Sequence, residues 1–171
     1  MNKLIITTII IFAAFTRLIP HPPNFTPIIA IGLFGGAYLK DNRLALIIPL
    51  IAMIIADVFL GFHGTMIWVY GSLIIISMMG ILLKNRTSLV NCSVAALGGS
   101  LLFFVVTNFG VWFISGLYEK SIAGLITCYA MALPFFHNTL AGSVVYSAIM
   151  FGGYEVLKNY LPDSVPDSIQ K

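Results

Sequence analysis

The chain has 171 residues, of which 59% are hydrophobic and only 9% are charged, and its mean hydropathy is +0.99. An ordinary soluble domain carries about 25% charged residues, so the composition is typical of a membrane protein and excludes a large globular catalytic domain. Nine basic and six acidic residues leave a net charge of +3. They are scattered between apolar runs, which excludes a dense basic tract for nucleic acid.

The first apolar run, residues 4–19, has two interpretations. A signal peptide shows the same pattern of an early basic residue, here Lys3, followed by an apolar stretch. However, the run passes directly into Arg17 and Pro20 without a small-x-small cleavage site, and the sequence downstream is equally apolar. We therefore expect an uncleaved first membrane span, with a cleaved signal peptide as the alternative.

Further apolar segments follow, separated by Pro-rich or charged breaks, and helix is the default for each. The expected spans are residues 26–39, 44–60, 65–83, 89–115 and 137–157. Because Pro134 interrupts the last apolar stretch, we expect residues 122–133 to form a short half-helix on the outer side. The sequence thus predicts an all-α membrane protein, a bundle of about six transmembrane helices in one domain over residues 1–160. Residues 161–171 are expected to form a disordered cytoplasmic tail.

The basic residues predict the orientation of these spans, because short cytoplasmic loops collect Lys and Arg. With six spans and a cytoplasmic N-terminus, seven basic residues lie inside and two, Arg17 and Lys120, lie outside. Counting residues 122–133 as a full crossing changes this to five against four. We therefore expect a multi-pass protein of the bacterial inner membrane with both termini in the cytoplasm.

This topology gathers the informative polar residues on the outer side. The candidate site residues are Arg17, His21, Asn24, Asp57, Asn108, Trp112, His137 and Asn138. In one interpretation the aromatic residues, with Trp68, Tyr70 and Tyr118, form an interfacial belt and the polar residues cap helices. In the other, the eight residues line an outward-facing pocket for a small solute. Arg17 and Asp57 are expected to pair, because an ionisable group within an apolar helix is costly when it is alone; the pair can be structural or part of the site.

Catalytic and cofactor motifs are missing from the sequence. It contains no Ser nucleophile motif, no H-E-x-x-H and no paired carboxylates at helical spacing, and no Lys-Ser/Thr follows Gly32, Gly35 and Gly36 as in a phosphate-binding loop. Cys92 and Cys128 stand alone in apolar segments and are expected to be buried thiols. We expect neither an enzyme nor a bound metal or cofactor.

Small residues recur four positions apart, which places them on one helix face and allows a second helix to come close. The pairs are Gly32 with Gly36, Ala52 with Ala56, and Ala95 with Gly99. They indicate either packing inside the bundle or a docking face for a partner protein.

Several segments resemble a family of uncharacterised, transport-type bacterial membrane proteins. They are Arg17 to Ala37, with the sequence RLIPHPPNFTPIIAIGLFGGA, and residues 49–57, 107–112, 124–129 and 133–138. That family in turn resembles the substrate-binding S components of energy-coupling factor (ECF) transporters, and Leu133 to Asn138 (LPFFHN) is similar to a Pro-Phe-Asn stretch before the last helix of some vitamin-specific members. Those proteins commonly carry an Ala-x-x-x-Ala motif on helix one for the coupling subunit, whereas this chain has Ala13 and Ala14 side by side.

The resemblance implies a subunit that captures a vitamin-like small molecule from the outer side, with a separate coupling subunit and ATPases as partners. The alternative function is a structural or assembly factor that binds another membrane protein. A membrane enzyme using His and Asp ranks third.

Overall fold

A computed structural model describes residues 3–160 of the chain, and these residues form helices and connecting turns with no strand. The expected all-α fold is therefore confirmed for the described residues, whereas the expected tail, residues 161–171, lies outside them. In chain order the elements are α1 (Lys3–Phe15), the 3-10 helix η1 (Thr16–Leu18), α2 (Ile28–Tyr38), α3 (Asn42–Leu60), α4 (Met66–Leu82), α5 (Leu89–Ile114), α6 (Ile122–Ser147), the π-helix η2 (Ala148–Gly152) and α7 (Gly153–Lys158).

Short polar residues begin three of these helices. Asp41, Ser88 and Ser121 precede α3, α5 and α6, and the side chain of each accepts a hydrogen bond from a backbone N–H in the first turn. These bonds satisfy donors that a helix start otherwise leaves unpaired. Gly61, with a φ of 91°, ends α3 in a conformation that glycine adopts without strain.

The helices agree with the expected segments except at Pro134. Pro134 lies inside α6, which continues through η2 and α7 as one 37-residue helix, Ile122–Lys158. The predicted break and the separate half-helix over residues 122–133 are therefore wrong. Packing on both sides of the proline explains the continuity, since Phe104 of α5 contacts Tyr129 and Phe136, with ring centroids 5.7 and 4.9 Å away. Proline removes one helix hydrogen bond, and tertiary contacts of this kind compensate for it in long apolar helices.

Three described helices are long and apolar enough to cross a membrane: Asn42–Leu60, Leu89–Ile114 and Ile122–Lys158. The other apolar helices are shorter. α2 has 11 residues and extends only about 16 Å at 1.5 Å per residue.

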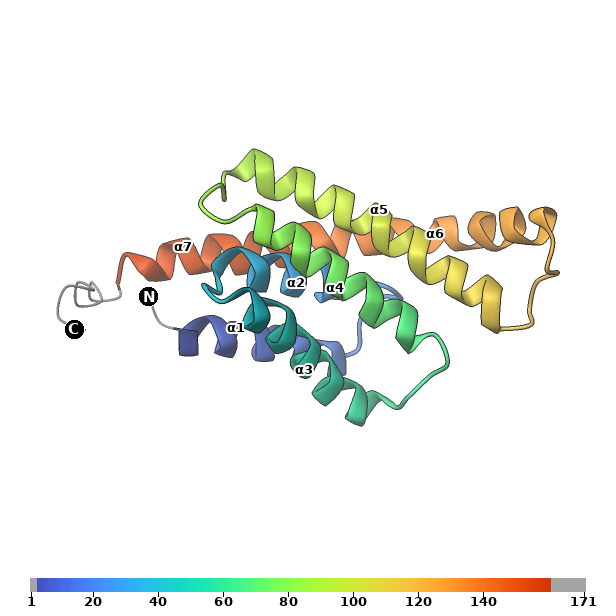
Figure 1. The fold of residues 1–171 in the computed structure, drawn as a ribbon, viewed down its shortest axis with the longest axis horizontal. Coiled ribbons are helices and arrows are strands. Elements are labelled where there is room, and N and C mark those ends of the chain that lie inside the picture. Colours follow the sequence, from blue (N-terminus) through green and yellow to red (C-terminus); the bar gives the residue numbers. More distant parts are fainter. Residues whose placement is uncertain (1–2, 161–171) are drawn as a thin grey trace.

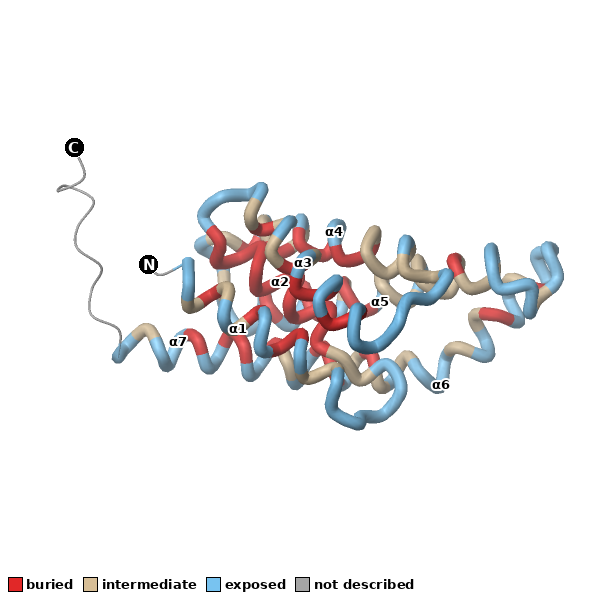
Figure 2. Tube along the Cα trace, turned by 90° about the horizontal axis from the view of Figure 1, so that it is seen from below, coloured by how far each residue is buried: buried red, intermediate tan, exposed pale blue. Residues whose placement is uncertain are grey.

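The short helix α2 forms the centre of the bundle. Each of its residues from Ile28 to Tyr38 is buried, and it packs against α1, α3, α4, α5 and α6 (Figures 1 and 2). The contact with α4 is backbone to backbone: a Cβ added to Gly36 would lie 2.3 Å from the carbonyl oxygen of Ser77. Ala52 and Ala56 are buried too, and a Cβ added to Gly99 would lie 3.0 Å from Ile29. All three pairs of small residues thus serve packing inside the bundle.

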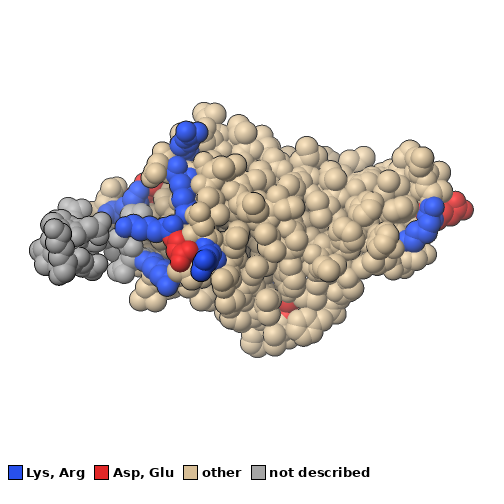
Figure 3. Space-filling view, in the orientation of Figure 1, with Lys and Arg blue, Asp and Glu red and all other residues tan. Residues whose placement is uncertain are grey.

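The charged residues of the described chain lie mainly at the two ends of the elongated molecule. Basic side chains gather at the end near the N-terminus, and Glu119 and Lys120 lie in the turn between α5 and α6 at the opposite end (Figures 1 and 3). The broad middle of the face in Figure 3 is almost free of charge. We call these the basic end and the hairpin end.

Candidate functional site

Arg17 and Asp57 meet in the interior of the bundle, as their sequence positions predicted. The Arg17 Nη1 atom lies 2.6 Å from Asp57 Oδ1, and the side chains are 11% and 3% exposed. Tyr70 of α4 donates its hydroxyl to the other carboxylate oxygen, Oδ2, at 2.7 Å. We call Arg17, Asp57 and Tyr70 the ionic network. It joins η1 at the end of α1 to α3 and α4.

Burial makes this network energetically demanding. Removing two charges from water costs several kcal/mol per ion, and their attraction offsets that cost only when the remaining lone pairs are hydrogen-bonded. Asp57 meets this condition, because each of its two oxygens has a donor. The guanidinium of Arg17 has five N–H groups, and its hydrogen bonds to Asp57 and to Met53 Sδ, the latter at 3.8 Å, are both made through Nη1.

The loop between η1 and α2 is fixed to α6. Asn138 donates its side-chain amide to the carbonyl oxygen of Pro23 at 2.9 Å, and Phe25 packs on Tyr146 with ring centroids 5.8 Å apart. Within the loop, His21 Nδ1 lies 2.6 Å from the carbonyl oxygen of Ile19, and Asn24 has a φ of 64°. We call the bond from Asn138 to Pro23 the loop clamp.

Two more candidate residues, Asn108 and Trp112, lie on α5 toward the hairpin end. Asn108 donates to the carbonyl oxygen of Phe104, one turn earlier in its own helix, at 2.8 Å. Trp112 donates its indole N–H to the carbonyl oxygen of Glu119 at 2.8 Å, and the Lys120 ammonium lies 5.2 Å from the centroid of its ring. Lys120 also donates to the carbonyl oxygens of Trp112 and Phe113. Trp112 therefore holds the turn between α5 and α6 closed.

The eight candidate residues thus fall into separate places. Arg17 and Asp57 form the ionic network, Asn138 clamps the loop that holds His21 and Asn24, Asn108 and Trp112 lie toward the hairpin end, and His137 is exposed on α6. Within residues 3–160, no hydrogen bond or ion pair joins one of these places directly to another. Sequence reasoning missed Tyr70 as a partner of Asp57, because its position also suits an interfacial aromatic residue.

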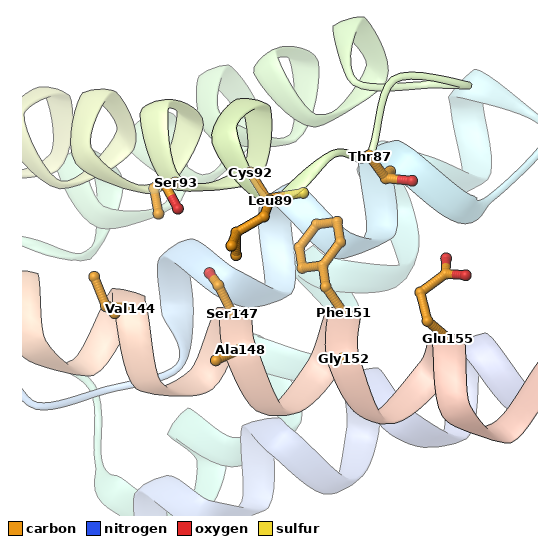
Figure 4. Close-up of a pocket in the computed structure, with 11 residues that line it drawn as sticks. Thr87, Leu89, Cys92, Ser93, Val144, Ser147, Ala148, Phe151, Gly152 and Glu155 are labelled. Atoms are coloured by element: carbon orange, nitrogen blue, oxygen red, sulfur yellow. The ribbon is translucent and has the colours of Figure 1, made fainter.

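A second feature, absent from the sequence-based prediction, lies at the basic end. A cavity of about 320 Å³ separates α5 from the helix formed by α6, η2 and α7 (Figure 4). Leu89, Cys92 and Ala96 of α5 line one side, and Ser147, Phe151 and Glu155 line the other. We call it the apolar cavity. Glu155 accepts hydrogen bonds from the Tyr38 hydroxyl at 2.5 Å and the Lys158 ammonium at 2.9 Å.

A more polar cavity of about 440 Å³ lies at the same end and shares Thr87 with the apolar cavity. Its lining includes the side chains of Lys40, Lys84 and Lys158. The Lys84 ammonium donates to the Asn42 side chain at 2.7 Å and to the Lys40 carbonyl oxygen at 3.0 Å, which holds it in place. We call this the basic cavity.

In the part of the chain that the structure describes, no three His, Cys, Asp or Glu side chains lie close enough together to bind a metal ion. Cys92 and Cys128 are buried free thiols, as expected.

Comparison with known proteins identifies the family of the chain. The model of a family of unknown function (DUF6580) matches residues 1–164, so the chain belongs to that family. The match confirms the expected uncharacterised family and gives no link to ECF S components. No curated protein and no solved structure matches the chain.

Proposed function

We propose that this member of a family of unknown function is an integral membrane protein that captures a small solute on the outer side of the membrane. Its role would be that of the S component of an ECF-type importer for a vitamin-like molecule. The observation that carries the proposal is the ionic network, a buried ion pair within an otherwise uncharged middle. Ionisable groups at membrane depth are rare and commonly mark a substrate or ion pathway.

The surface of the molecule supports a place in the membrane. Large apolar side chains are exposed along the helices, among them Leu4, Phe12, Ile67, Leu82 and Leu101. An apolar surface of this extent is unfavourable in water and suits lipid tails. The proposed topology has six crossings with both termini in the cytoplasm, which places the basic end inside and the hairpin end outside.

The bonding of the ionic network favours one class of solute. Each oxygen of Asp57 already accepts one hydrogen bond, and the charge of Arg17 beside it disfavours a cationic solute. Arg17 keeps further N–H groups beyond the one directed at Asp57, and these can donate to a carboxylate or carbonyl of a solute. We therefore propose recognition through hydrogen-bond acceptors on the solute.

The loop clamp gives the proposed site a cover. The loop over residues 19–27 connects η1, which carries Arg17, to α2, and Asn138 holds it on α6. Opening this bond would expose the neighbourhood of Arg17 to the outer side, and closing it would retain a bound solute. Import itself would draw energy from separate coupling and ATPase subunits, since the sequence has no phosphate-binding loop.

A thermal-shift screen of the detergent-solubilised protein against vitamins, nucleobases, amino acids and divalent metals tests the proposal. A solute at a hundredfold excess over its Kd stabilises the folded state by about 2.7 kcal/mol. We expect a shift with one class of acceptor-bearing solute and its loss in Asn138→Ala. Asn91→Ala is the matched control, because Asn91 also donates to a backbone carbonyl, that of Arg86, but lies at the basic end.

The screen can also contradict the proposal. If Asn138→Ala and Asn91→Ala reduce the thermal shift equally, the solute does not bind at the loop clamp. If no solute in a broad panel shifts the transition and another membrane protein co-purifies, the structural or assembly role is the better explanation.

A further inference from the structure

We propose that the basic end of the molecule binds one anionic phospholipid of the inner leaflet. The phosphate would lie among the lysines of the basic cavity, and one acyl chain would enter the apolar cavity between α5 and η2. This inference rests on the membrane setting of the proposed function but not on solute capture, because the ionic network is a separate site.

The apolar cavity has the size and lining of a ligand site. Its volume of about 320 Å³ falls within the range of small-molecule pockets, about 300–1,000 Å³. Leu89, Ala96 and Phe151 give it walls that suit a hydrocarbon chain. Figure 4 shows Leu89 and Phe151 at the space between the two helices.

An unused hydrogen-bond donor also points to a ligand. Ser147 lines the apolar cavity and is 6% exposed, yet its hydroxyl has no hydrogen-bond partner within residues 3–160. A buried hydroxyl without a hydrogen-bond partner destabilises the fold. An ester carbonyl of a lipid would supply the missing acceptor. Ser147 directly precedes the π-helix η2, a helix irregularity that is frequent at functional sites.

The charges select an anionic headgroup. Lys40, Lys84 and Lys158 line the basic cavity, and the nearest acid, Glu155, already accepts hydrogen bonds from Tyr38 and Lys158. Because Lys158 offsets the charge of Glu155, Lys40 and Lys84 leave the site with a net positive charge. Basic pockets between membrane helices on the cytoplasmic side bind anionic lipid headgroups in this way.

The two cavities are placed for one amphipathic molecule. Thr87 lines both, and the ion pair of Glu155 with Lys158 connects a residue of the apolar cavity to a residue of the basic cavity. A soluble phosphate would occupy only the basic part, whereas a phospholipid fills both parts. This continuity favours the lipid as the source of the phosphate.

Native mass spectrometry of the detergent-solubilised full chain, titrated with phosphatidylglycerol or phosphatidylcholine, tests the inference without any solute present. We expect phosphatidylglycerol to bind more tightly, and Lys40→Gln with Lys158→Gln to weaken it by about 30-fold, since each lysine near a membrane surface contributes about fivefold. Arg43→Gln with Arg86→Gln is the matched control. These residues carry the same charge at the same end but are not among the lining residues of either cavity.

A second pair of variants tests the acyl chain. Ala148→Phe fills the apolar cavity and should reduce phosphatidylglycerol binding, whereas Val94→Phe adds the same bulk to an exposed position of α5 outside the lining and should not. Lys40 is exposed, so Lys40→Gln alone should still fold if another variant does not. We expect it to weaken phosphatidylglycerol binding by about fivefold.

Three outcomes would overturn the inference. They are equal binding of the two lipids, equal loss in the lysine and arginine pairs, and displacement of phosphatidylglycerol by inorganic phosphate, which would assign the basic cavity to a soluble phosphate. Failure of the solute screen with success here would leave the lipid site intact, because neither cavity includes a residue of the ionic network or the loop clamp.

Discussion

Arg17 and Asp57 depend on each other because both side chains are largely buried. Arg17→Ala leaves a buried carboxylate with only the Tyr70 hydroxyl as a donor. We expect this change to lower the free energy of unfolding by about 3–5 kcal/mol, the usual cost of breaking a buried pair. The double change Arg17→Met and Asp57→Leu should restore most of that loss, since apolar replacement of a buried pair is often neutral. Thermal unfolding in detergent measures both.

The double variant also decides what the pair is for. If stability returns and a solute still binds, the pair is scaffold alone. If stability returns and binding is lost, Arg17 contacts the solute as proposed. A single variant as stable as the parent would contradict the energetic argument itself.

Tyr70 provides a second test of the same carboxylate. Tyr70→Phe removes the donor to Asp57 Oδ2 and keeps the ring, so we expect a loss of about 1.5–3 kcal/mol, the range for hydrogen bonds to charged groups. Tyr129→Phe is the control, because it removes a bond to the neutral backbone carbonyl of Val105 on an exposed surface. It should cost about 0.5–1.5 kcal/mol. Equal losses would show that the charge of Asp57 adds nothing.

Asn24 separates a backbone role from a binding role. Its φ of 64° lies in the left-handed region, which asparagine and glycine adopt more readily than other residues. Asn24→Ala should therefore cost about 1–2 kcal/mol, and Asn24→Gly should leave stability nearly unchanged. If Asn24→Gly also keeps solute affinity in the thermal-shift assay, the residue shapes the loop. A selective loss of affinity in that variant would instead assign its amide to the solute.

Electrostatics explains why one contact of the site could be predicted from the sequence. Two ionisable groups inside apolar runs have few alternatives to pairing, so the contact of Arg17 with Asp57 could be predicted. The partner Tyr70 could not, because a tyrosine near a helix end also suits the membrane interface. Asn108 lies toward the hairpin end of α5, but no pattern in the sequence shows that its amide bonds to its own helix.

Between elements, the closest approach is the crossing of α2 and α4. A Cβ added to Gly80 would lie 2.5 Å from the carbonyl oxygen of Leu33 and 2.8 Å from its Cα, atoms that cannot move aside as a side chain can. We expect Gly80→Ala to destabilise the fold by about 1–3 kcal/mol through overpacking. Gly71→Ala in the same helix has nothing within 4 Å of the new Cβ and should stabilise by about 0.5–1 kcal/mol. Unfolding curves of the two variants that shift in the same direction would contradict this packing.

Helix boundaries could be predicted to within a few residues, because Pro-rich and charged breaks separate the apolar runs. Pro134 shows where local reasoning fails. A proline disfavours a helix through its own backbone, but the contacts of Phe104 with residues on both sides of it act over a longer range. The two cavities at the basic end could not be predicted from the sequence either. They depend on how the C-terminal helix packs against segments about 50 or more positions earlier in the chain.

At the scale of the whole molecule, helix length and charge bear on the proposed orientation. The helix Ile122–Lys158 has 37 residues and extends about 55 Å, whereas the hydrocarbon core of a bilayer is about 30 Å thick. Part of it must therefore lie outside the core or tilt strongly. The hairpin end carries the turn charges Glu119 and Lys120 and extends beyond the helices α1 to α4 (Figures 1 and 3), so in the proposed topology part of the excess length lies on the outer side.

Cysteine labelling tests this orientation. In a background in which the buried Cys92 and Cys128 are replaced by alanine, Glu119→Cys at the hairpin end should react with a membrane-impermeant maleimide in intact cells. Arg86→Cys at the basic end should react only after permeabilisation, because the positive end of a membrane protein stays in the cytoplasm. Labelling of both positions from the same side would mean that α5, the helix between them, does not cross the membrane. Reaction of both positions in intact cells would take the lipid site away from the inner leaflet, and reaction of both only after permeabilisation would take the hairpin end away from the outer side.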